Sequence, residues 1–359
     1  MQGRASYLEQ KLKEMDIDIE ILFRDNIKKI VPYSTARDEY KGKKVDIYLD
    51  ANENPFDTDL NRYPDPHQKL LKEKISEIQR IPVENIFLGN GSDEAIDLII
   101  RAFCRPGIDK IMIHPPTYGM YQVAAQTNDN EVIKVNLTHD FQLNVNEILS
   151  QSNEKLKVFF ICSPNNPTGN TFATNDIEQI LKELNTIVVI DEAYINFSDK
   201  ESWTKRLDEF PNLIVMQTLS KAWGLAGIRL GMAFASERII EVLSRIKLPY
   251  NLNVLTQQTA LKCLNNIEQY NQNLALIKNE RERLSGELRN LPIVQKIYPS
   301  DGNYILCKFN NANETYNYLM NKGVIVRNRS NQLHCENCLR ITVGTPEDNI
   351  MLIKYLEEL

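Results

Sequence analysis

Five short apolar runs between residues 86 and 216 constrain the fold of this 359-residue chain more than any other feature. Each run consists of aliphatic or aromatic residues and is followed by a stretch with helical character. The runs are Ile86–Leu88, Ile111–Ile113, Val158–Ile161, Ile187–Ile190 and Leu213–Met216. Near-continuous apolar strands separated by helices are typical of a mainly parallel sheet that helices cover on both faces. The sequence therefore predicts an α/β fold with ligands beyond the carboxyl ends of the strands.

The C-terminal part of the chain has a different pattern. Apolar residues recur at helical spacing from Thr256 to Asn290, which predicts one long helix. Strands are expected near Tyr304–Phe309, Val324–Val326 and Leu339–Val343, before a final amphipathic helix that follows Pro346. This pattern predicts a smaller α+β domain after a large domain with a mixed, mainly parallel sheet.

The chain is long for a single core, so two unequal domains are expected. We expect residues 1–50 to form an N-terminal arm and part of the small domain, with a helical character in the first thirty residues or so. Residues 51–255 are expected to form the large domain, and residues 256–359 the small C-terminal domain.

Composition narrows the class of protein. Lys plus Arg is 42 and Asp plus Glu is 48, and the resulting net charge of −6 argues against a general nucleic-acid binder, which needs a basic face. No run approaches the roughly 18 apolar residues of a membrane span. The polar N-terminus lacks the apolar core of a signal peptide, so we expect a cytoplasmic location.

The six cysteines are scattered, which fits a reducing compartment. Cys335 and Cys338 form one C-x-x-C pair beside His334, but a structural zinc site normally needs a second pair nearby. We expect two reduced thiols near a strand and no metal.

Two glycine- and proline-containing turns follow predicted strands. Gly89-Asn90-Gly91-Ser92-Asp93-Glu94 precedes an apolar helix, so Ser92 and Asp93 open a helix whose exposed N–H groups can bind an anion. A plain capped helix start is the alternative. Ser163-Pro164-Asn165-Asn166-Pro167-Thr168-Gly169 is a rigid turn that presents an amide side chain above the sheet, although an ordinary turn explains the same residues.

Charged residues follow two further strands. Asp191 ends the run Ile187–Ile190, where a carboxylate needs a cation or hydrogen-bond donors, and Tyr194 is near enough to reach the same ligand. A helix cap is the alternative for Asp191. Lys221 follows the run Leu213–Met216, and a lysine in an apolar site can lose its charge and become a nucleophile toward an aldehyde. A solvated lysine is its alternative.

The order and spacing of these segments resemble the fold-type-I pyridoxal-phosphate aminotransferases, from about Val31 to about Gly344. Within that family the resemblance is greatest to the histidinol-phosphate group. The segments that carry it are Pro32-Tyr33, Asn52-Glu53-Asn54-Pro55, Asn61-Arg62-Tyr63-Pro64-Asp65, Gly91-Ser92-Asp93-Glu94, Pro115-Pro116-Thr117-Tyr118-Gly119-Met120-Tyr121, Asn165-Asn166-Pro167-Thr168-Gly169, Asp191-Glu192-Ala193-Tyr194, Thr218-Leu219-Ser220-Lys221 and Cys338-Leu339-Arg340-Ile341-Thr342-Val343-Gly344.

The resemblance implies pyridoxal 5′-phosphate as the cofactor, held covalently by Lys221. It implies that Lys221 also moves a proton during the reaction, and that Asp191 pairs with the ring nitrogen. Asn166 and Tyr194 would bind the ring oxygen, and Tyr118 would stack on the ring. We expect Lys221, Asp191 and Tyr194 to be the catalytic residues.

The resemblance also implies where the cofactor phosphate binds. Its partners would be Ser92 and Asp93 at the helix start, with Ser220 and Arg229. Tyr63 would reach the phosphate of the neighbouring subunit, which implies a homodimer with shared active sites.

At the substrate end, the resemblance implies that Arg340 binds the acidic group, with Arg327 as a second arginine. Tyr33 would close over the substrate, and Asn52 would offer it an amide. Arg329 adds another cation beside Arg327, which leaves open which arginine meets a phosphate. A solvated loop is the alternative for Arg327 and Arg329.

The implied reaction is a reversible ping-pong transamination in histidine biosynthesis. L-histidinol phosphate and 2-oxoglutarate would give imidazole acetol phosphate and L-glutamate. An aromatic amino-acid aminotransferase and a decarboxylase of a phosphorylated amino acid are alternatives with the same architecture. A cofactor-binding regulatory domain is a further alternative, but it normally carries a basic DNA-binding segment, which the N-terminus does not offer.

Overall fold

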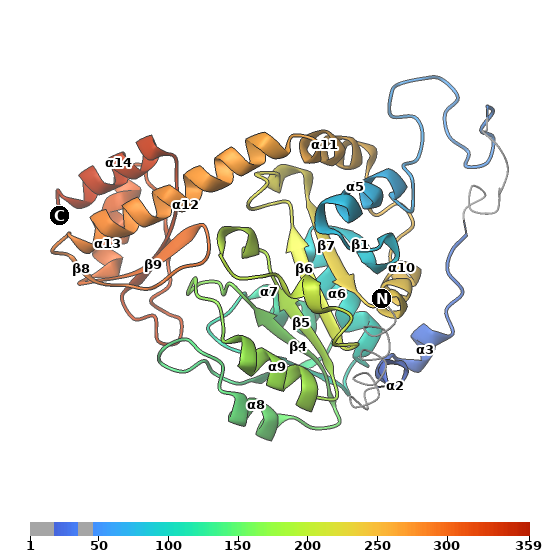
Figure 1. Cartoon of the computed structure of the whole chain (residues 1–359), viewed down its shortest axis with the longest axis horizontal. Helices are drawn as coiled ribbons and strands as arrows, with labels where there is room; N and C mark the ends of the chain where they lie inside the picture. The colour runs from blue at the N-terminus through green and yellow to red at the C-terminus, as the bar shows by residue number, and fades with distance from the viewer. Residues whose placement is uncertain (1–17, 35–45) are drawn as a thin grey trace, which may run out of the picture.

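The computed structural model describes residues 18–34 and 46–359, and two sheets organise this part of the chain (Figure 1). The larger sheet has seven strands in the order β1-β7-β6-β5-β4-β2-β3, and the smaller has four in the order β10-β11-β9-β8. The strands of the larger sheet are β1 (Ile86–Asn90), β2 (Lys110–Ile113), β3 (Glu131–Lys134), β4 (Leu156–Cys162), β5 (Ile187–Asp191), β6 (Leu213–Thr218) and β7 (Leu230–Ala235).

The larger sheet is mainly parallel, as the sequence predicts. All five apolar runs lie within its strands β1, β2, β4, β5 and β6. Strand β7 is antiparallel to both of its neighbours, β1 and β6, whereas the other pairs are parallel. Strands β3 and β7 come in addition to those that the apolar runs predict.

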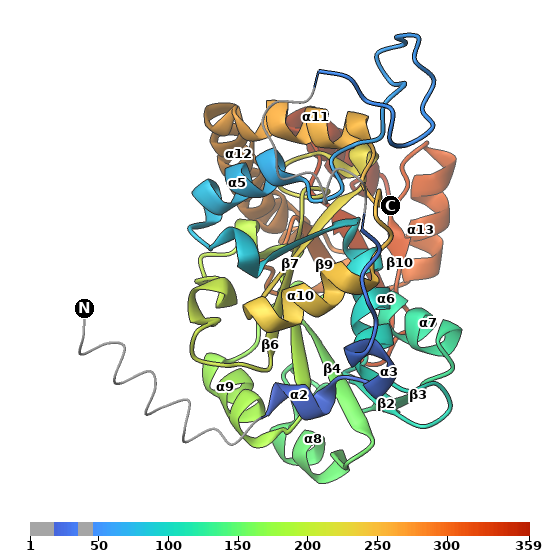
Figure 2. The ribbon, with the colours of Figure 1, turned by 90° about the vertical axis from the view of Figure 1, so that its right-hand side faces the viewer.

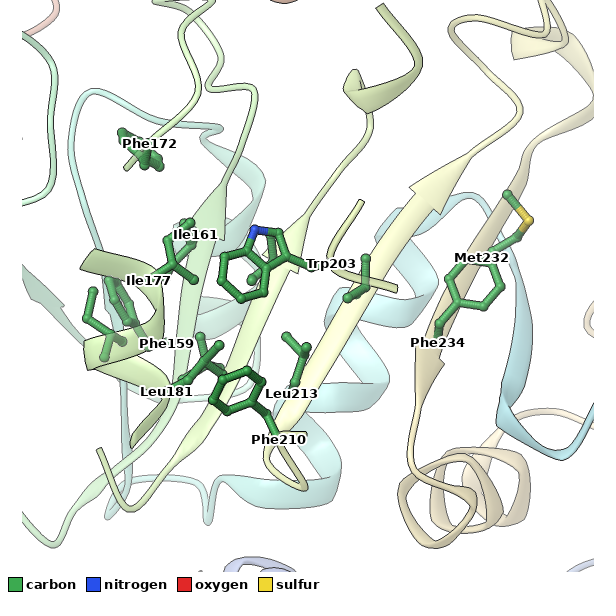
Figure 3. Packing of buried hydrophobic residues seen from close by; sticks show 14 of the residues in the cluster. Phe159, Ile161, Phe172, Ile177, Leu181, Trp203, Phe210, Leu213, Met232 and Phe234 are labelled. Carbon is green, nitrogen blue, oxygen red and sulfur yellow. The ribbon is translucent and has the colours of Figure 1, made fainter. Parts of the chain in front are cut away.

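Consecutive residues of the central strands point to opposite faces of the sheet, so each strand contributes side chains to two apolar clusters, one on each face. Phe159 of β4 belongs to one apolar cluster and Phe160 to the other. Figure 3 shows the first cluster, where Phe159 packs near Ile177 of α9 and Trp203 lies over the sheet. A sheet buried on both faces explains why its strands read as unbroken apolar runs.

Helices cover both faces of the larger sheet (Figure 2). They are α5 (Lys69–Gln79), α6 (Ser92–Phe103), α7 (Met120–Thr127), α8 (Val145–Gln151), α9 (Thr174–Glu183), α10 (Glu237–Ile246) and α11 (Val254–Leu264), with short 3-10 turns η1 (Val83–Asn85), η2 (Ile195–Phe197), η3 (Trp203–Arg206) and η4 (Ala226–Ile228). None of the helices within residues 18–34 and 46–359 is long and apolar enough to cross a membrane.

The smaller sheet forms a second layer with three helices at the other end of the molecule (Figure 1). Its strands are all antiparallel, and one face packs on the helices around Leu284, Leu319 and Leu352. The elements are α12 (Ile267–Arg289), β8 (Val294–Ile297), β9 (Tyr304–Phe309), α13 (Ala312–Asn321), β10 (Arg327–Asn328), β11 (Cys338–Thr342) and α14 (Pro346–Leu356).

Two predictions for this region were wrong in detail. The single helix predicted from Thr256 to Asn290 is two helices, because α11 ends at Leu264 and Asn266 caps α12 by accepting a 3.4 Å hydrogen bond from the Gln269 N–H. Val324–Val326 is not a strand, and pairing begins only at Arg327. The strand near Tyr304–Phe309 and the final helix at Pro346 are confirmed.

The N-terminal region is only partly described. Two four-residue helices, α2 (Ile19–Leu22) and α3 (Asp25–Lys28), lie near α10 and α6, and the rest of the predicted helical arm is outside the described residues. Much of the chain between residue 46 and α5 extends away from the rest of the molecule in both views, and its last residues pack against α11 and the loop before it (Figures 1 and 2).

Candidate active site

A cavity lies at the carboxyl ends of β5 and β6, where the sheet topology predicts a ligand site. It contains nine of the ten residues predicted to bind the cofactor, all except Tyr63. Its lining consists of Ser92, Asp93, Tyr118, Cys162, Asn166, Asp191, Ala193, Tyr194, Thr218, Ser220, Lys221 and Arg229. Residues spread over more than 130 positions of the chain therefore meet in one place.

One end of this cavity is the N-terminus of α6. Its first N–H groups have no partners within the helix, and Gly91, at the N-cap position, supplies no side-chain cap. The carbonyl of Arg229 accepts a 2.8 Å hydrogen bond from the Gly91 N–H, and Nη2 of Arg229 lies 3.2 Å from Oδ2 of Asp93. A helix N-terminus beside a guanidinium group is a suitable site for a phosphate.

Two glycines allow the close packing at this end. Gly91 has a φ of 76°, in the left-handed region, and a Cβ there would lie 2.7 Å from Nη2 of Arg229. A Cβ at Gly231 of β7 would lie 2.1 Å from the backbone nitrogen of Ser92. No real side chain fits that contact, so β7 reaches the start of α6 only because residue 231 is glycine.

The carboxylate of Asp191 lies at the end of β5 and is almost fully buried. It accepts hydrogen bonds from the Tyr121 hydroxyl at 2.6 Å and from the Ala193 N–H at 3.1 Å. Desolvation raises its pKa, and the hydrogen bond from Tyr121 acts in the opposite direction. A buried carboxylate of this kind is stabilised most by a cationic partner.

Tyr121 is a site residue that the sequence reasoning did not single out. It is fully buried in the first turn of α7 and stacks on Phe160 with ring centroids 4.7 Å apart. Its signal in the sequence is its place at the end of the resemblance segment Pro115–Tyr121, and its ring lies 5.5 Å from that of Tyr118 between centroids.

Lys221 follows β6 and opens onto the cavity, with Nζ 5.7 Å from the centre of the Tyr194 ring. Desolvation lowers the pKa of its amine, and the charge of Arg340 lowers it further. Both effects increase the fraction of neutral amine at a given pH, which is the nucleophilic form.

Asn166 and Tyr194 form a polar wall next to the lysine. Nδ2 of Asn166 donates to the Tyr194 hydroxyl at 3.5 Å, and Nη1 of Arg340 donates to Oδ1 of Asn166. Desolvation raises the pKa of the Tyr194 hydroxyl, so it stays protonated and remains a hydrogen-bond donor. Arg340 thus links the small sheet to the cavity.

The arginines predicted for the substrate end lie together. Arg327 of β10 pairs with Arg340 of β11, and the Arg329 N–H continues the ladder by donating to the Cys338 carbonyl at 2.8 Å. Burial lowers the pKa of Arg329, with further contributions from the charges of Arg340 and Arg327. The alternative of a solvated loop therefore does not describe Arg329, which is half-buried.

Besides Arg327 and Arg340, which are not part of the cavity lining, three more predicted site residues lie outside this cavity within the single chain. Tyr63 stacks on Tyr250 with ring centroids 4.5 Å apart and, together with Asn52, lines a separate hollow. Tyr33 lines another hollow with Lys72. These residues come from the N-terminal part of the chain, and the structure does not place them beside Lys221.

The C-x-x-C segment is part of the core. Cys335 and Cys338 are buried free thiols, and burial raises the pKa of Cys338 to about 11. The ring of His334 lies 4.0 Å from that of His139 between centroids. Across residues 18–34 and 46–359, no group of three or more His, Cys, Asp or Glu side chains is arranged to hold a metal ion.

The chain belongs to the aminotransferase class I and II family, whose sequence pattern matches residues 39–356. Two of its relatives have the same name and are about half identical to this chain. A histidinol-phosphate aminotransferase of Christiangramia forsetii is 52% identical over 96% of this chain and 99% of its own length. A protein of the same name from Bacteroides thetaiotaomicron is 50% identical over 95% of this chain and 98% of its own.

Solved structures share the fold. The histidinol-phosphate aminotransferase of Clostridium acetobutylicum has a TM-score of 0.77 at 24% identity and covers 84% of this chain and 91% of its own. The enzyme of the same name from Sinorhizobium meliloti, solved in complex with pyridoxal-5′-phosphate, has a TM-score of 0.76 at 20% identity and covers 84% and 83%. An L-threonine-O-3-phosphate decarboxylase from Porphyromonas gingivalis, with a TM-score of 0.71 at 23% identity, covers 83% and 90%. Fold alone therefore does not separate transamination from decarboxylation.

Proposed function

We propose that this protein transfers the amino group of L-histidinol phosphate to 2-oxoglutarate, with pyridoxal 5′-phosphate as cofactor. The products are imidazole acetol phosphate and L-glutamate, and the reaction belongs to histidine biosynthesis. The observation that carries this proposal is the meeting of Lys221, Asp191 and the α6 N-terminus in one cavity. Relatives of about the same length that are half identical to the chain support the choice of substrate.

The residues of the cavity fit this cofactor group by group. The α6 N-terminus, Ser220 and Arg229 suit its phosphate, because a helix start and a planar guanidinium both bind phosphate oxygens. The buried Asp191 carboxylate suits the protonated ring nitrogen. Asn166 and Tyr194 offer donors for the ring oxygen, and Tyr118 offers a ring face for stacking.

The bound cofactor supplies an electron sink that stabilises negative charge at the substrate α-carbon. Asp191 keeps the ring nitrogen protonated, which maintains that sink. The Nζ atom of Lys221 would bind the cofactor and, when free, would carry the proton from the substrate α-carbon to the cofactor carbon that receives the amino group. Its lowered pKa serves this second role, because only a neutral amine can accept a proton.

The arginines of the small sheet provide the positive charge that both substrates require. Arg340 and Arg327 face the phosphate of histidinol phosphate in one half-reaction and a carboxylate of 2-oxoglutarate in the other. Guanidinium groups bind both anions through paired N–H donors. Because these arginines lie on the smaller sheet, we assign substrate recognition mainly to residues 256–359 and cofactor binding to residues 51–255.

The working form we propose is a homodimer with shared active sites, located in the cytoplasm. Tyr63 lies in the stretch between residue 46 and α5. In the same stretch, the apolar side chains of Ile47, Leu49 and Phe56 are 76%, 89% and 78% exposed. A second copy would cover these apolar side chains, and exposed apolar surface of this kind commonly marks an interface. In that arrangement Tyr63 contributes to the cavity of the neighbouring subunit, and Tyr33 and Asn52 complete the substrate site.

Shared sites make a clear prediction for mixed dimers. Lys221→Ala and Tyr63→Ala subunits, each inactive or weak alone, should regain activity when they are co-expressed, because one cavity of the mixed dimer then has both residues. A molecular mass of one chain in sedimentation, or no gain on mixing, would contradict the shared site.

The proposed reaction is tested by adding stoichiometric L-histidinol phosphate to the holoenzyme without a keto acid. We expect imidazole acetol phosphate to form in a single turnover, the absorption spectrum of the bound cofactor to change, and 2-oxoglutarate to restore it while glutamate appears. Conversion of phenylalanine or tyrosine but not histidinol phosphate would favour the aromatic aminotransferase. Release of carbon dioxide from a phosphorylated amino acid would favour the decarboxylase.

A further inference from the structure

The small sheet carries three arginines on one face. Directly opposite residues of an antiparallel pair point to the same side, and Arg327 lies opposite Arg340. Arg329, two residues after Arg327 on the same extended stretch, therefore shares that side. The alternate residues Leu339 and Ile341 point the other way, into the core with α12, α13 and α14. The side with the arginines is thus the one turned toward the large sheet.

Other residues on this side confirm the direction. Leu306 lies opposite Arg340, and Cys338 lies beside Arg329; both belong to the apolar cluster built mainly from the large-sheet side of the molecule. Arg340 itself reaches Asn166, a residue of the cavity. Arg329 is close enough to the cavity that Arg340, Arg327 and the Tyr194 hydroxyl all influence its pKa, after the larger effect of burial.

The three positive charges have no acidic partner among residues 18–34 and 46–359. No ion pair of the described residues includes Arg327, Arg329 or Arg340, although Glu and Asp side chains pair with many other arginines of the molecule. The Nε atoms of Arg329 and Arg340 are buried without a hydrogen-bond partner. An arginine with a purely structural role is normally paired, and a purely solvated one is not half-buried.

We propose that Arg329 is a third arm of the anion subsite and gives it a preference for a doubly charged phosphate over a singly charged carboxylate. This inference rests on the proposed function, since it concerns the substrate of the same cavity. The physical reason is that three guanidinium groups repel one another until an anion lies between them. A dianion neutralises more of that repulsion than a monoanion, so the third arginine contributes most to binding of a phosphate.

The kinetic test compares the two half-reactions in the Arg329→Gln holoenzyme. We expect kcat/KM for L-histidinol phosphate to fall about 10- to 100-fold, the range for loss of one hydrogen bond between charged groups, mainly through KM. The value for 2-oxoglutarate should fall by less than about 3-fold, because a carboxylate depends less on the third charge. Arg329→Lys should recover part of the loss, because it keeps the charge but not the fork of donors.

Arg289→Gln is the matched control, because Arg289 is an exposed arginine at the end of α12 and its loss changes the net charge equally. It should leave both half-reactions unchanged. Equal losses for the two substrates in Arg329→Gln, or no loss for histidinol phosphate, would overturn the role of Arg329.

A binding measurement separates this inference from the proposed reaction. Titration calorimetry of inorganic phosphate into holoenzyme should give a Kd that Arg329→Gln raises at least about 10-fold, with acetate affected less. If the wild-type protein does not convert histidinol phosphate, the proposed function fails, yet this phosphate preference still tests Arg329. Unchanged phosphate binding in both Arg329→Gln and Arg329→Lys would overturn the subsite even in an enzyme that converts histidinol phosphate.

Discussion

The cofactor end and the substrate end of the cavity are built in opposite ways. At the cofactor end, Asp191 already has two hydrogen-bond donors and Asp93 already pairs with Arg229. At the substrate end, Arg327, Arg329 and Arg340 have no acidic partner among the described residues. The Arg340 guanidinium donates to the Asn166 amide oxygen and lies over the Tyr304 ring, 5.2 Å from its centroid. At the cofactor end the carboxylates already have partners within the protein, whereas at the substrate end the arginines keep their charge for a ligand.

We relate this difference to how long each ligand stays bound, because the cofactor stays in the site while the two substrates alternate. A cofactor that stays bound is best held by groups whose positions are fixed beforehand, and strand ends of a doubly covered sheet supply such positions. Two substrates that alternate need a charged surface that accepts either one. The comparison predicts that substitutions at the cofactor end mainly affect the rate, whereas those at the substrate end mainly affect KM.

The largest expected effect is that of Lys221→Ala. We expect kcat to fall by roughly 1,000-fold or more, because both the covalent link and the proton transfer are lost. Steady-state rates and the absorption spectrum of the bound cofactor would measure this change. Lys200→Ala, at an exposed position, is the control and should keep full activity; a loss of less than about 10-fold in Lys221→Ala would refute the assignment of the lysine.

The next effect concerns Asp191→Asn. We expect kcat to fall roughly 100- to 1,000-fold, the range for loss of one preorganised electrostatic partner, with a much smaller loss of cofactor affinity. Single-turnover rates and cofactor titration would separate the two quantities. Equal losses of rate and affinity would count against an electronic role for this carboxylate.

Tyr121→Phe should have a moderate effect, about 10-fold on kcat/KM, since it removes one hydrogen bond to a buried carboxylate. That hydrogen bond holds the pKa of Asp191 down against desolvation, so its loss raises the pKa. The ionised form is the active one, and activity should therefore disappear at a higher pH on the acidic limb of the profile. An acidic limb that does not move would show that Tyr121 has only a packing role.

The smallest effect would show how the two ends are coupled. Arg340→Gln removes the second largest cause of the lowered pKa of Lys221, so this pKa should rise while desolvation still holds it below the ordinary value. A higher pKa leaves less neutral amine at neutral pH, and cofactor uptake by the apoprotein at pH 7 should slow by less than about 10-fold. Its pH profile should shift upward, which stopped-flow measurements across pH would reveal. Arg289→Gln should leave the profile in place, and a downward shift in Arg340→Gln would contradict the coupling.

The sequence predicts the large sheet well because its strands are buried on both faces and their apolar runs are unbroken. Strand β7 was not predicted, because Leu230–Ala235 contains Gly and Ala in place of β-branched residues. Strand β3 is a four-residue edge strand with charged ends. The break between α11 and α12 is set by the Asn266 cap, which a count of apolar positions does not register.

The residues of the candidate site also fall into two groups, those that the sequence could place and those that it could not. Residues at or just beyond strand ends, such as Asp191 and Lys221, could be placed because the carboxyl ends of the parallel strands meet at one edge of the sheet. Tyr63 and Asn52 remain predictions, because in the single chain they line a separate hollow and not the cavity that contains Lys221. Tyr121 was not predicted since its role comes only from a hydrogen bond to a residue 70 positions away.

Gly231 has a consequence for how this protein tolerates sequence change. The residue has no functional group and lies on a strand, yet its missing side chain sets how near β7 comes to the first turn of α6. A deep mutational scan should therefore record position 231 as intolerant even of alanine. The surviving variants would resemble enzymes that have lost their vitamin-derived cofactor, although every reactive side chain is intact. Growth medium enriched in that vitamin would be the natural way to rescue them.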